Sequence, residues 1–387
     1  MSNHVNRRNF LKLSATAGAA LALAPESVYA NETETSKKKM PVRTLGKRTG
    51  IKVPVLSMGV MNADNTSVVR AAYNSGITHF DTAHGYQSGR NEEMLGEFFA
   101  DKPRDSFIIA TKVKEAPSEN AGANFLEKFE ISMRRLKMPY VDIMYYHMPN
   151  LEDVNYAPIL DVLQKLKRDG RIKYIGISTH SNEPAVINTA VDNGNYDVVL
   201  TSYNYTQKHL TELNPAIDRA AKAGLGVVAM KTMAGGNRDK EATQKVNTSA
   251  ALKWVLQNPN IHTAIPGFTT FDMLEESLEA AMNLKMNKDE KKYLSMIHPT
   301  MYCQGCRICE GQCPKHLPIP EMMRAYMYTY GYKNPSMAKE LIDELALADD
   351  LCSDCTTCTV KCTAGFQIAQ KVKDISRLQY VPQEFLV

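Results

Sequence analysis

The placement of the cysteines constrains this chain more than any other feature of its sequence. Eight cysteines occur in 387 residues, and none lies before residue 303. A disulfide framework scatters its cysteines through a fold, whereas a metal site gathers them, so we expect metal ligation near the end of this sequence. The cysteines form two copies of the spacing C-x2-C-x2-C-x3-C, at Cys303, Cys306, Cys309 and Cys313 and again at Cys352, Cys355, Cys358 and Cys362.

Each copy has the ligand spacing of a bacterial ferredoxin cluster, in which soft thiolates hold iron. In that arrangement three closely spaced cysteines ligate one cluster and the fourth ligates the other. The spacing therefore predicts two 4Fe-4S clusters with crossed ligation. We expect Cys362 to join the first three cysteines of the chain, and Cys313 to join Cys352, Cys355 and Cys358.

Zinc and disulfide bonds are the alternatives to iron–sulfur clusters. Zinc sites use C-x2-C pairs without a regular third and fourth member. A disulfide between residues three apart would be strained, although an oxidising compartment favours disulfides in general. Pro314 follows the first motif, as in ferredoxins, whereas Thr363 stands at the matching place in the second. The regularity of both motifs favours iron–sulfur ligation.

The first 30 residues have the pattern of an export signal. The run Asn-Arg-Arg-Asn-Phe-Leu-Lys from Asn6 to Lys12 resembles the twin-arginine motif, and a weakly apolar stretch and a cleavage site at Ala30 follow it. An ordinary secretory signal with a chance Arg pair is the alternative. Because clusters are inserted in the reducing cytoplasm and the twin-arginine route carries folded proteins, the signal and the cysteine motifs support each other. We expect the export machinery as a partner, a periplasmic location, and a polar linker over residues 31–40.

Hydropathy and charge exclude two classes of partner. No apolar run approaches the ~20 residues that a bilayer span needs, so we expect no stable membrane span. The net charge is +4, from 46 basic and 42 acidic residues. Proteins that bind nucleic acid usually carry a strongly basic face, so this balance predicts no nucleic-acid partner.

Residues 41–298 alternate short apolar runs with amphipathic helical patterns, which predicts an α/β (β/α)8 TIM barrel. A doubly wound open sheet is the alternative, but the G-x-G-x-x-G turn typical of its nucleotide-binding members is missing. Residues 299–387 form the second domain, which we expect to be small, mostly helical and ferredoxin-like, with a helical stretch over 321–347. The predicted strands cover 53–58, 78–82, 107–113, 141–147, 174–178, 198–203, 226–231 and 263–267.

Four ionisable residues fall where predicted strands end, which is where the reacting groups of such barrels lie. Asp81, Lys112 and His147 are near the ends of the second, third and fourth strands, and Tyr86 follows five residues after Asp81. A Lys or an Asp inside an apolar strand is costly unless it is paired. We therefore expect Asp81 and Lys112 to pair with each other.

At these residues the chain resembles the aldo-keto reductase superfamily, over residues 42–284. The resemblance includes all four positions of the family's catalytic tetrad, and the cysteine-rich tail is similar to that of an iron–sulfur branch. It is also carried by the segments Arg43-Thr44-Leu45-Gly46, Asp81-Thr82-Ala83-x2-Tyr86 and Asn91-Glu92-Glu93-x-Leu95-Gly96.

The resemblance implies hydride transfer between a nicotinamide and a carbonyl carbon. Tyr86 would donate the proton, with its acidity raised by nearby Lys112, which Asp81 holds in position. His147 would hydrogen-bond the substrate oxygen. NAD(P) is then the candidate cofactor, and the implied cofactor-binding residues are Ser178, Tyr203, Asn204, Lys231, Gly267 and Glu276.

Several cofactor positions depart from the family. Leu200 stands where a carboxamide-binding Gln is usual, Met230 replaces a ring-stacking aromatic residue, and no Arg or Lys follows Gly267 directly. His84 and His180 are candidate substrate contacts, with ordinary structural histidines as the alternative. We expect the tyrosine-rich stretch 326–332 to pack around the clusters.

These features favour an exported oxidoreductase acting on a small carbonyl or alcohol, with electrons relayed by the two clusters to or from a redox partner protein. The alternative is an iron–sulfur electron-transfer protein whose barrel is a non-catalytic scaffold. Binding of a substrate without turnover, as a sensor, is a third hypothesis.

Overall fold

A computed structural model describes residues 40–235, 246–296, 302–349, 351–352, 355 and 357–386. The predicted signal segment and all but the last residue of the predicted linker lie outside the described residues. The expected domain boundary near residue 299 lies outside them as well, so it stays a prediction. No helix in the described part of the chain is long and apolar enough to cross a membrane.

Eight parallel strands form one sheet whose spatial order follows the chain. Parallel bridges from Leu56 to Ala264 and from Gly59 to Gly267 join its first and last strands, so the sheet closes into the predicted barrel. The strands are β3 (Met58–Gly59), β4 (His79–Asp81), β5 (Ile108–Val113), β6 (Val141–His147), β7 (Ile172–Thr179), β8 (Val198–Ser202), β9 (Gly226–Met230) and β10 (Thr263–Ala264).

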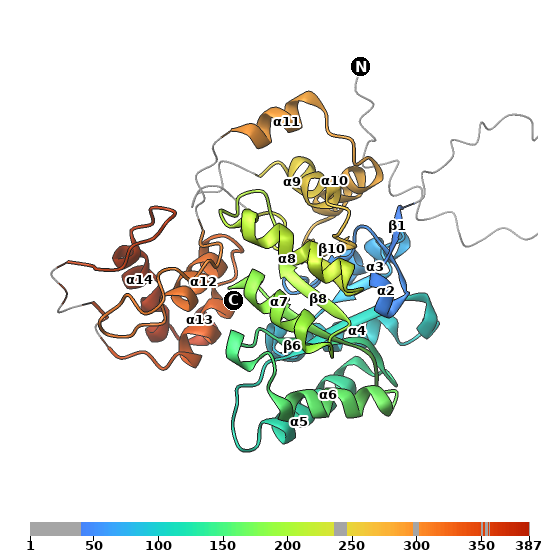
Figure 1. Cartoon of the computed structure of the whole chain (residues 1–387), viewed down its shortest axis with the longest axis horizontal. Coiled ribbons are helices and arrows are strands. Elements are labelled where there is room, and N and C mark those ends of the chain that lie inside the picture. Colours follow the sequence, from blue (N-terminus) through green and yellow to red (C-terminus); the bar gives the residue numbers. More distant parts are fainter. Residues whose placement is uncertain are drawn as a thin grey trace, which may run out of the picture. The chain divides into compact units, whose positions relative to one another are not determined.

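A helix follows each strand and lies outside the sheet (Figure 1). Each helix buries one face; in the helix of residues 157–168, for example, Ile159, Leu163 and Leu166 recur at helical spacing and are buried. The outer helices are α3 (Thr66–Asn74), α4 (Arg90–Phe99), α5 (Ala121–Leu136), α6 (Ala157–Arg168), α7 (Glu183–Asn193), α8 (Leu210–Lys222), α9 (Thr248–Gln257) and α10 (Phe271–Met282), followed by α11 (Lys288–Ser295).

The strand predicted over 53–58 is two strands with different partners. Its start is β2 (Lys52–Pro54), which pairs with β1 (Val42–Thr44) in an antiparallel hairpin around the short helix α2 (Gly46–Thr49). Its end is β3, the first barrel strand. The apolar run is continuous because both parts are buried, so hydropathy alone does not mark the break.

The C-terminal region is helical and has its own hydrophobic core. Its helices are α12 (Ile319–Tyr330), α13 (Pro335–Glu344) and α14 (Ile368–Ser376), and Met322, Ile342 and Val372 are buried between them. The single helical stretch expected over 321–347 is broken in two. Asn334 caps α13 through the Met337 N–H, and Pro335 begins that helix because a proline is tolerated in the first turn.

The β1–β2 hairpin supplies apolar side chains to the interior of the barrel. Leu45 and Val53 are fully buried there, in one cluster with Ile143, Tyr145 and Val228 of the barrel strands. A Cβ at Gly226 would lie 2.7 Å from the Leu45 Cγ atom, so β9 approaches Leu45 closely only because residue 226 is glycine. Leu45 therefore fills the interior between the hairpin and the strands.

We predict that Leu45→Ala lowers the stability of the protein by about 2–5 kcal/mol, because it removes buried methyl groups and leaves a cavity. The measurement is the melting temperature of the holoprotein. Val42→Ala in the same hairpin is the control, since Val42 is 57% exposed. Equal melting temperatures for the two variants would contradict the assigned role of Leu45.

Candidate functional site

The four predicted catalytic residues line one cavity of about 1340 Å³. Asp81 ends β4, Lys112 lies next to the end of β5, and His147 ends β6. Tyr86 begins the 3-10 turn η1 (Tyr86–Gly89), which follows β4. Neighbouring parallel strands place their carboxyl ends at one rim, so the closed sheet brings together side chains that are 66 residues apart in the chain.

Hydrogen bonds from the loop residues hold Tyr86 at this rim. Gln87 and Ser88 have left-handed backbone conformations, and the Gln87 side-chain amide donates to the Met61 carbonyl oxygen at 3.0 Å. Asn91 of the conspicuous Asn-Glu-Glu motif donates to the Val60 carbonyl at 2.6 Å and accepts from the Thr82 hydroxyl at 2.6 Å. This motif therefore anchors the start of α4 to the strand ends.

Lys112 and Asp81 form the expected buried pair. The Lys112 Nζ atom donates to the Asp81 carboxylate and, at 2.6 Å, to the Thr82 carbonyl oxygen. The two side chains are 1% and 3% exposed. Burial lowers the pKa of Lys112, and the Asp81 carboxylate counteracts this effect. Lys112 Nζ also lies 5.0 Å from the centre of the Tyr86 ring, so the cation faces the phenol.

The electrostatics of Tyr86 differ from the expectation. Burial raises the pKa of Tyr86 well above its usual value, and Asp81, Tyr328 and Tyr332 raise it further. The phenol is therefore protonated, as a proton donor must be, but the protein around it does not make it more acidic. Burial of the phenol is the main physical reason, and the Asp81 carboxylate adds to it.

His147 stands edge-to-face against Tyr86, with ring centroids 6.2 Å apart. Burial lowers the pKa of His147 well below its usual value, and the charges of Lys112, Lys114 and Arg324 lower it further. Its imidazole is therefore neutral and can donate one N–H hydrogen bond toward the cavity without carrying charge.

Four of the six predicted cofactor residues line the same cavity, namely Ser178, Lys231, Gly267 and Glu276. The other two do not. The Tyr203 hydroxyl donates to Asn214 at 2.8 Å, and its ring packs on Trp254 with centroids 4.9 Å apart, so this side chain belongs to the outer helix layer.

Asn204 also points away from the cavity. Its side-chain amide donates to the Lys231 carbonyl at 3.2 Å and to the Gln304 side chain at 3.0 Å. Asn204 therefore links the barrel to the segment that carries the first cysteines. The expectation of cofactor contact is corrected for both Tyr203 and Asn204, because these hydrogen bonds already use their polar groups.

Of the two histidines that were candidate substrate contacts, only one lines the cavity. His180 lines the cavity, whereas the His84 Nδ1 atom lies 3.1 Å from the Ser132 hydroxyl in the α5 layer. His84 is therefore a structural histidine, which was the alternative to a substrate contact.

The C-terminal region completes the cavity wall, which the sequence did not indicate. Arg324 and Tyr328 of α12 and Tyr332 after it line the cavity. The rings of Tyr328 and Tyr332 are stacked with centroids 5.7 Å apart. The expectation that 326–332 only packs around the clusters is thus wrong for these two tyrosines, because the chain brings this face of α12 over the barrel rim.

Polar contacts attach the C-terminal helices to the barrel loops. The Ser88 hydroxyl lies 3.2 Å from Glu340, and Lys114 pairs with Glu344 at 2.7 Å. The Asn334 amide donates to the Asn62 side chain at 2.9 Å. These contacts surround the part of the cavity that holds Tyr86.

The cysteines gather in two groups. Burial raises the pKa of Cys303, and the neighbouring thiols of Cys306 and Cys362 raise it further. For Cys309, burial and the thiols of the same group raise the pKa to about 12. The Cys306 Sγ atom lies 3.8 Å from the Thr363 hydroxyl, which shows that the end of the second motif reaches the first.

The remaining four cysteines form the other group. Burial raises the pKa of Cys352, and the thiols of Cys355, Cys313 and Cys358 add to this effect. Across the described ranges, no three His, Cys, Asp or Glu side chains converge closely enough to hold a single metal ion. The eight cysteines supply soft thiol donors, and soft thiolates are the ligands that iron–sulfur clusters use.

The first cysteine group adjoins the barrel rim. A Cβ at Gly305 would lie 2.2 Å from the His180 carbonyl oxygen, so the left-handed glycine lets this segment touch the loop after β7. The positive charge of Lys231 also lowers the pKa of Cys303. His180 and Lys231 therefore lie between this cysteine group and the cavity.

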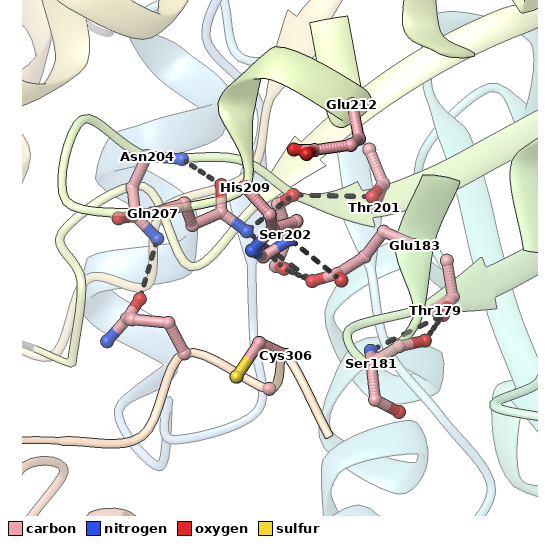
Figure 2. Close-up of polar contacts among 12 residues, drawn as sticks. Thr179, Ser181, Glu183, Thr201, Ser202, Asn204, Gln207, His209, Glu212 and Cys306 are labelled. Atoms are coloured by element: carbon pink, nitrogen blue, oxygen red, sulfur yellow. Dashed lines mark hydrogen bonds and ion pairs between the residues drawn. The ribbon is translucent and has the colours of Figure 1, made fainter. Parts of the chain in front are cut away.

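A buried polar network supports the contact between the barrel and the segment that carries the first cysteines. The sequence analysis did not predict this network (Figure 2). The carboxylate of Glu183, at the start of α7, accepts from the Ser202 hydroxyl and lies 3.1 Å from the His209 Nε2 atom. The Gln207 amide donates to the same carboxylate at 3.4 Å, and Gln207 accepts from the Asn204 N–H at 3.0 Å. Figure 2 shows Cys306 beside this network. The network holds the loop after β8 in the conformation that presents Asn204 to Gln304.

Comparison with known proteins gives three family matches. Residues 57–249 match the aldo/keto reductase family, residues 279–367 match the 4Fe-4S dicluster domain, and residues 4–24 match the signal sequence of the twin-arginine translocation pathway.

Similar proteins include oxidoreductases that act on sugars. The D-threo-aldose 1-dehydrogenase of a Pseudomonas species is 27% identical over 48% of this chain and 68% of its own length. The L-galactose dehydrogenase of Arabidopsis thaliana is 27% identical over 67% of this chain and 93% of its own length.

The fold is also that of solved aldo-keto reductases. The holo form of an aldo-keto reductase from Bacillus halodurans superposes with a TM-score of 0.55, at 23% identity, over 66% of this chain and 95% of that one. The family matches show that the chain is an oxidoreductase with an aldo/keto reductase domain, a signal sequence of the twin-arginine pathway and a 4Fe-4S dicluster domain.

Proposed function

We propose that the protein interconverts a small carbonyl compound and its alcohol at the tetrad, in the periplasm, and that two 4Fe-4S clusters connect this site to an external redox partner. The observation that carries the proposal is the shared cavity wall. The tetrad lines the cavity from one side, and the helix that follows the first cysteine motif lines it from the other. Since two relatives are named for sugar oxidation, aldoses are the first substrates to test.

The side chains at the rim supply proton transfer and orientation. When bound, a nicotinamide would supply or accept the hydride at the substrate carbon. In the reducing direction the Tyr86 hydroxyl gives its proton to the substrate oxygen, while the neutral His147 imidazole donates a hydrogen bond to that oxygen. The carbon gains a hydride and the oxygen gains a proton, so the product is the alcohol. Lys112 then stands beside the tyrosinate and stabilises its charge.

The cavity extends from the tetrad to α10, which gives room for the rest of a dinucleotide. Gly267 and Thr270 line this arm of the cavity, and so do the acidic side chains of Asp272, Glu276 and Glu279. Carboxylates repel the 2′-phosphate that distinguishes NADP from NAD. We therefore infer that NAD is the preferred nicotinamide.

The clusters would be ligated in the crossed manner that the sequence predicts. The contact of Cys306 with Thr363, the residue after Cys362, supports this assignment for one cluster, and the influence of Cys313 on the Cys352 thiol supports it for the other. When bound, each cluster supplies one-electron transfer, and two clusters match a two-electron conversion of the substrate. The cysteine group next to His180 and Lys231 is the one closer to the cavity.

A non-catalytic barrel is the second candidate function. The observation in its favour is that Leu200, at the position of a carboxamide-binding Gln, is sealed in the interior cluster of the barrel. The chain would then transfer electrons while the barrel serves as a scaffold. Kinetic and spectroscopic experiments on variants of the tetrad and of the cysteines distinguish a catalytic barrel from a scaffold.

We expect Tyr86→Phe to lower kcat with aldoses and NAD by about 10²–10⁴-fold, because general acid–base catalysis contributes rate factors of that size. Steady-state kinetics on the iron-loaded protein measure the change. Tyr156→Phe is the matched control, since the Tyr156 hydroxyl donates to the Ser118 carbonyl away from the tetrad. Full activity of Tyr86→Phe would refute the catalytic role of the tetrad and favour the scaffold.

The clusters should change oxidation state during turnover. If they are reduced chemically without oxygen and a carbonyl substrate is then added with a catalytic amount of NAD, which can take two electrons and a proton to form the hydride donor, we expect the reduced-cluster absorbance and paramagnetic signal to disappear in the wild type but to persist in Tyr86→Phe. Equal reoxidation in both proteins would show that the electrons leave by a route that does not involve the tetrad. A full rate with NADH in a folded protein with Cys306 and Cys355 replaced would show that the clusters are structural.

Cys313→Ser should disturb the cluster that Cys352, Cys355 and Cys358 hold, even though Cys313 belongs to the first motif. Iron analysis together with Mössbauer or paramagnetic spectra of the two clusters measures the effect. Cys362→Ser is the reciprocal variant and should disturb the cluster of Cys303. The crossed assignment would be overturned if Cys313→Ser lost only the cluster of the first motif and Cys362→Ser lost only the cluster of the second.

A further inference from the structure

The C-terminal region places a cation in the catalytic cavity. Arg324 and Tyr328 are four residues apart on α12, so they occupy the same face of the helix. Both line the cavity together with Tyr86 and His147. Tyr328 is close enough to Tyr86 to affect its pKa, and the charge of Arg324 lowers the pKa of His147 and of His180. Arg324 therefore faces the same space as the reacting groups.

The charge of Arg324 is only partly balanced. Its guanidinium lies 3.3 Å from the Glu321 carboxylate, and the same carboxylate oxygen accepts from Arg307 at 2.8 Å. Two guanidinium groups thus share one carboxylate, although Arg324 is only 11% exposed. A buried cation without a full partner is unfavourable unless an anion approaches it.

Lys231 brings a second cation to the same place from the barrel side. It follows β9, adopts a left-handed backbone conformation and lines the cavity. Within the described ranges its amino group has no hydrogen bond or ion pair with another side chain. Burial and then the charge of Arg324 lower the pKa of Lys231 to about 7, and an anion bound in the cavity would favour the charged form of Lys231.

Lys112, Lys114 and Glu183 do not neutralise this pair. Lys112 is paired with Asp81, and Lys114 is paired with Glu344. Glu183 attracts Lys231 from behind, but its carboxylate is already bonded to Ser202 and His209. The acidic residues of α10 follow β10, where we propose that the rest of a nicotinamide dinucleotide lies.

We propose that the natural substrate carries an anionic group, a carboxylate or a phosphate, that Arg324 and Lys231 bind while its carbonyl or alcohol meets Tyr86 and His147. A guanidinium binds both oxygens of such a group in a planar, bidentate manner. This inference rests on the proposed function, because it specifies the substrate class of the same site. It also gives the iron–sulfur domain a second role, since it supplies a residue that selects the substrate.

The test uses three compounds that share one sugar skeleton and differ in charge at C6. They are D-glucuronate, D-glucose 6-phosphate and D-glucose, and their binding to the oxidised, iron-loaded protein is measured by isothermal titration calorimetry. We expect at least one anion to bind about ten- to a hundredfold more tightly than D-glucose, as charge-assisted hydrogen bonds would provide. A preference for glucuronate identifies a carboxylate substrate, and a preference for the phosphate ester identifies a phosphorylated one.

Variants then assign the preference to the two cations. Arg324→Gln and, independently, Lys231→Met should each reduce the ratio of anion affinity to glucose affinity about tenfold, while Arg324→Lys should retain part of it. Arg377→Gln is the matched control, because Arg377 is exposed in the same domain and does not line the cavity. Iron content and visible absorbance verify that each variant keeps its clusters.

Three results would overturn the inference. The first is equal affinity for all three sugars, or no binding of either anion. The second is an unchanged affinity ratio in both Arg324→Gln and Lys231→Met. The third is a loss of NADH affinity alone in these variants, which would assign the cations to the cofactor. Failure of the proposed function has a different signature, namely full turnover in Tyr86→Phe, because calorimetric binding requires no turnover.

Discussion

Closure of the parallel sheet is the constraint on which the rest of the structure depends. The Ser57 N–H donates to the Ala264 carbonyl at 2.8 Å, and the Gly59 N–H donates to the Pro266 carbonyl at 3.1 Å, which joins the first strand to the last. A Cβ at Gly59 would lie 2.7 Å from the Ile265 carbonyl oxygen, so the seam needs a glycine there. With the sheet closed, every strand directs its carboxyl end to one rim. Asp81, Tyr86, Lys112 and His147 therefore line a single cavity, although they come from different strands and loops.

The iron–sulfur domain is part of that cavity rather than an appendage. Glu321 illustrates the connection, because its carboxylate binds Arg307, which lies between two cysteines of the first motif, and also Arg324, which lines the cavity. One partly buried carboxylate thus joins the ligand loop to the cavity wall. On the barrel side, the network around Glu183 fixes the loop that presents Asn204 to Gln304. The two halves of the protein meet through polar groups that are hydrogen-bonded on both sides.

Sequence reasoning succeeded where a residue's role follows from local spacing. The eight-strand alternation and the two cysteine motifs were predicted correctly, because strand periodicity and ligand spacing are properties of short segments. It was wrong for Tyr203, whose aromatic ring and hydroxyl are equally suited to a cofactor site and to the contacts with Trp254 and Asn214 that it makes. It missed Arg324, because one arginine in an amphipathic helix is usually a solvated one. Only the packing of α12 over the rim shows otherwise.

The sequence by itself determined the barrel, the buried Asp81–Lys112 pair and the thiolate donor set, because an apolar strand tolerates two charges only as a pair and the cysteine spacing matches one class of metal centre. The tertiary structure decided which charged side chains line the cavity. The electrostatics of Tyr86 and the cations of Arg324 and Lys231 result from burial and from neighbours far away in the chain. Desolvation and Coulomb interactions depend on distances in space, and no pattern along the sequence contains these distances.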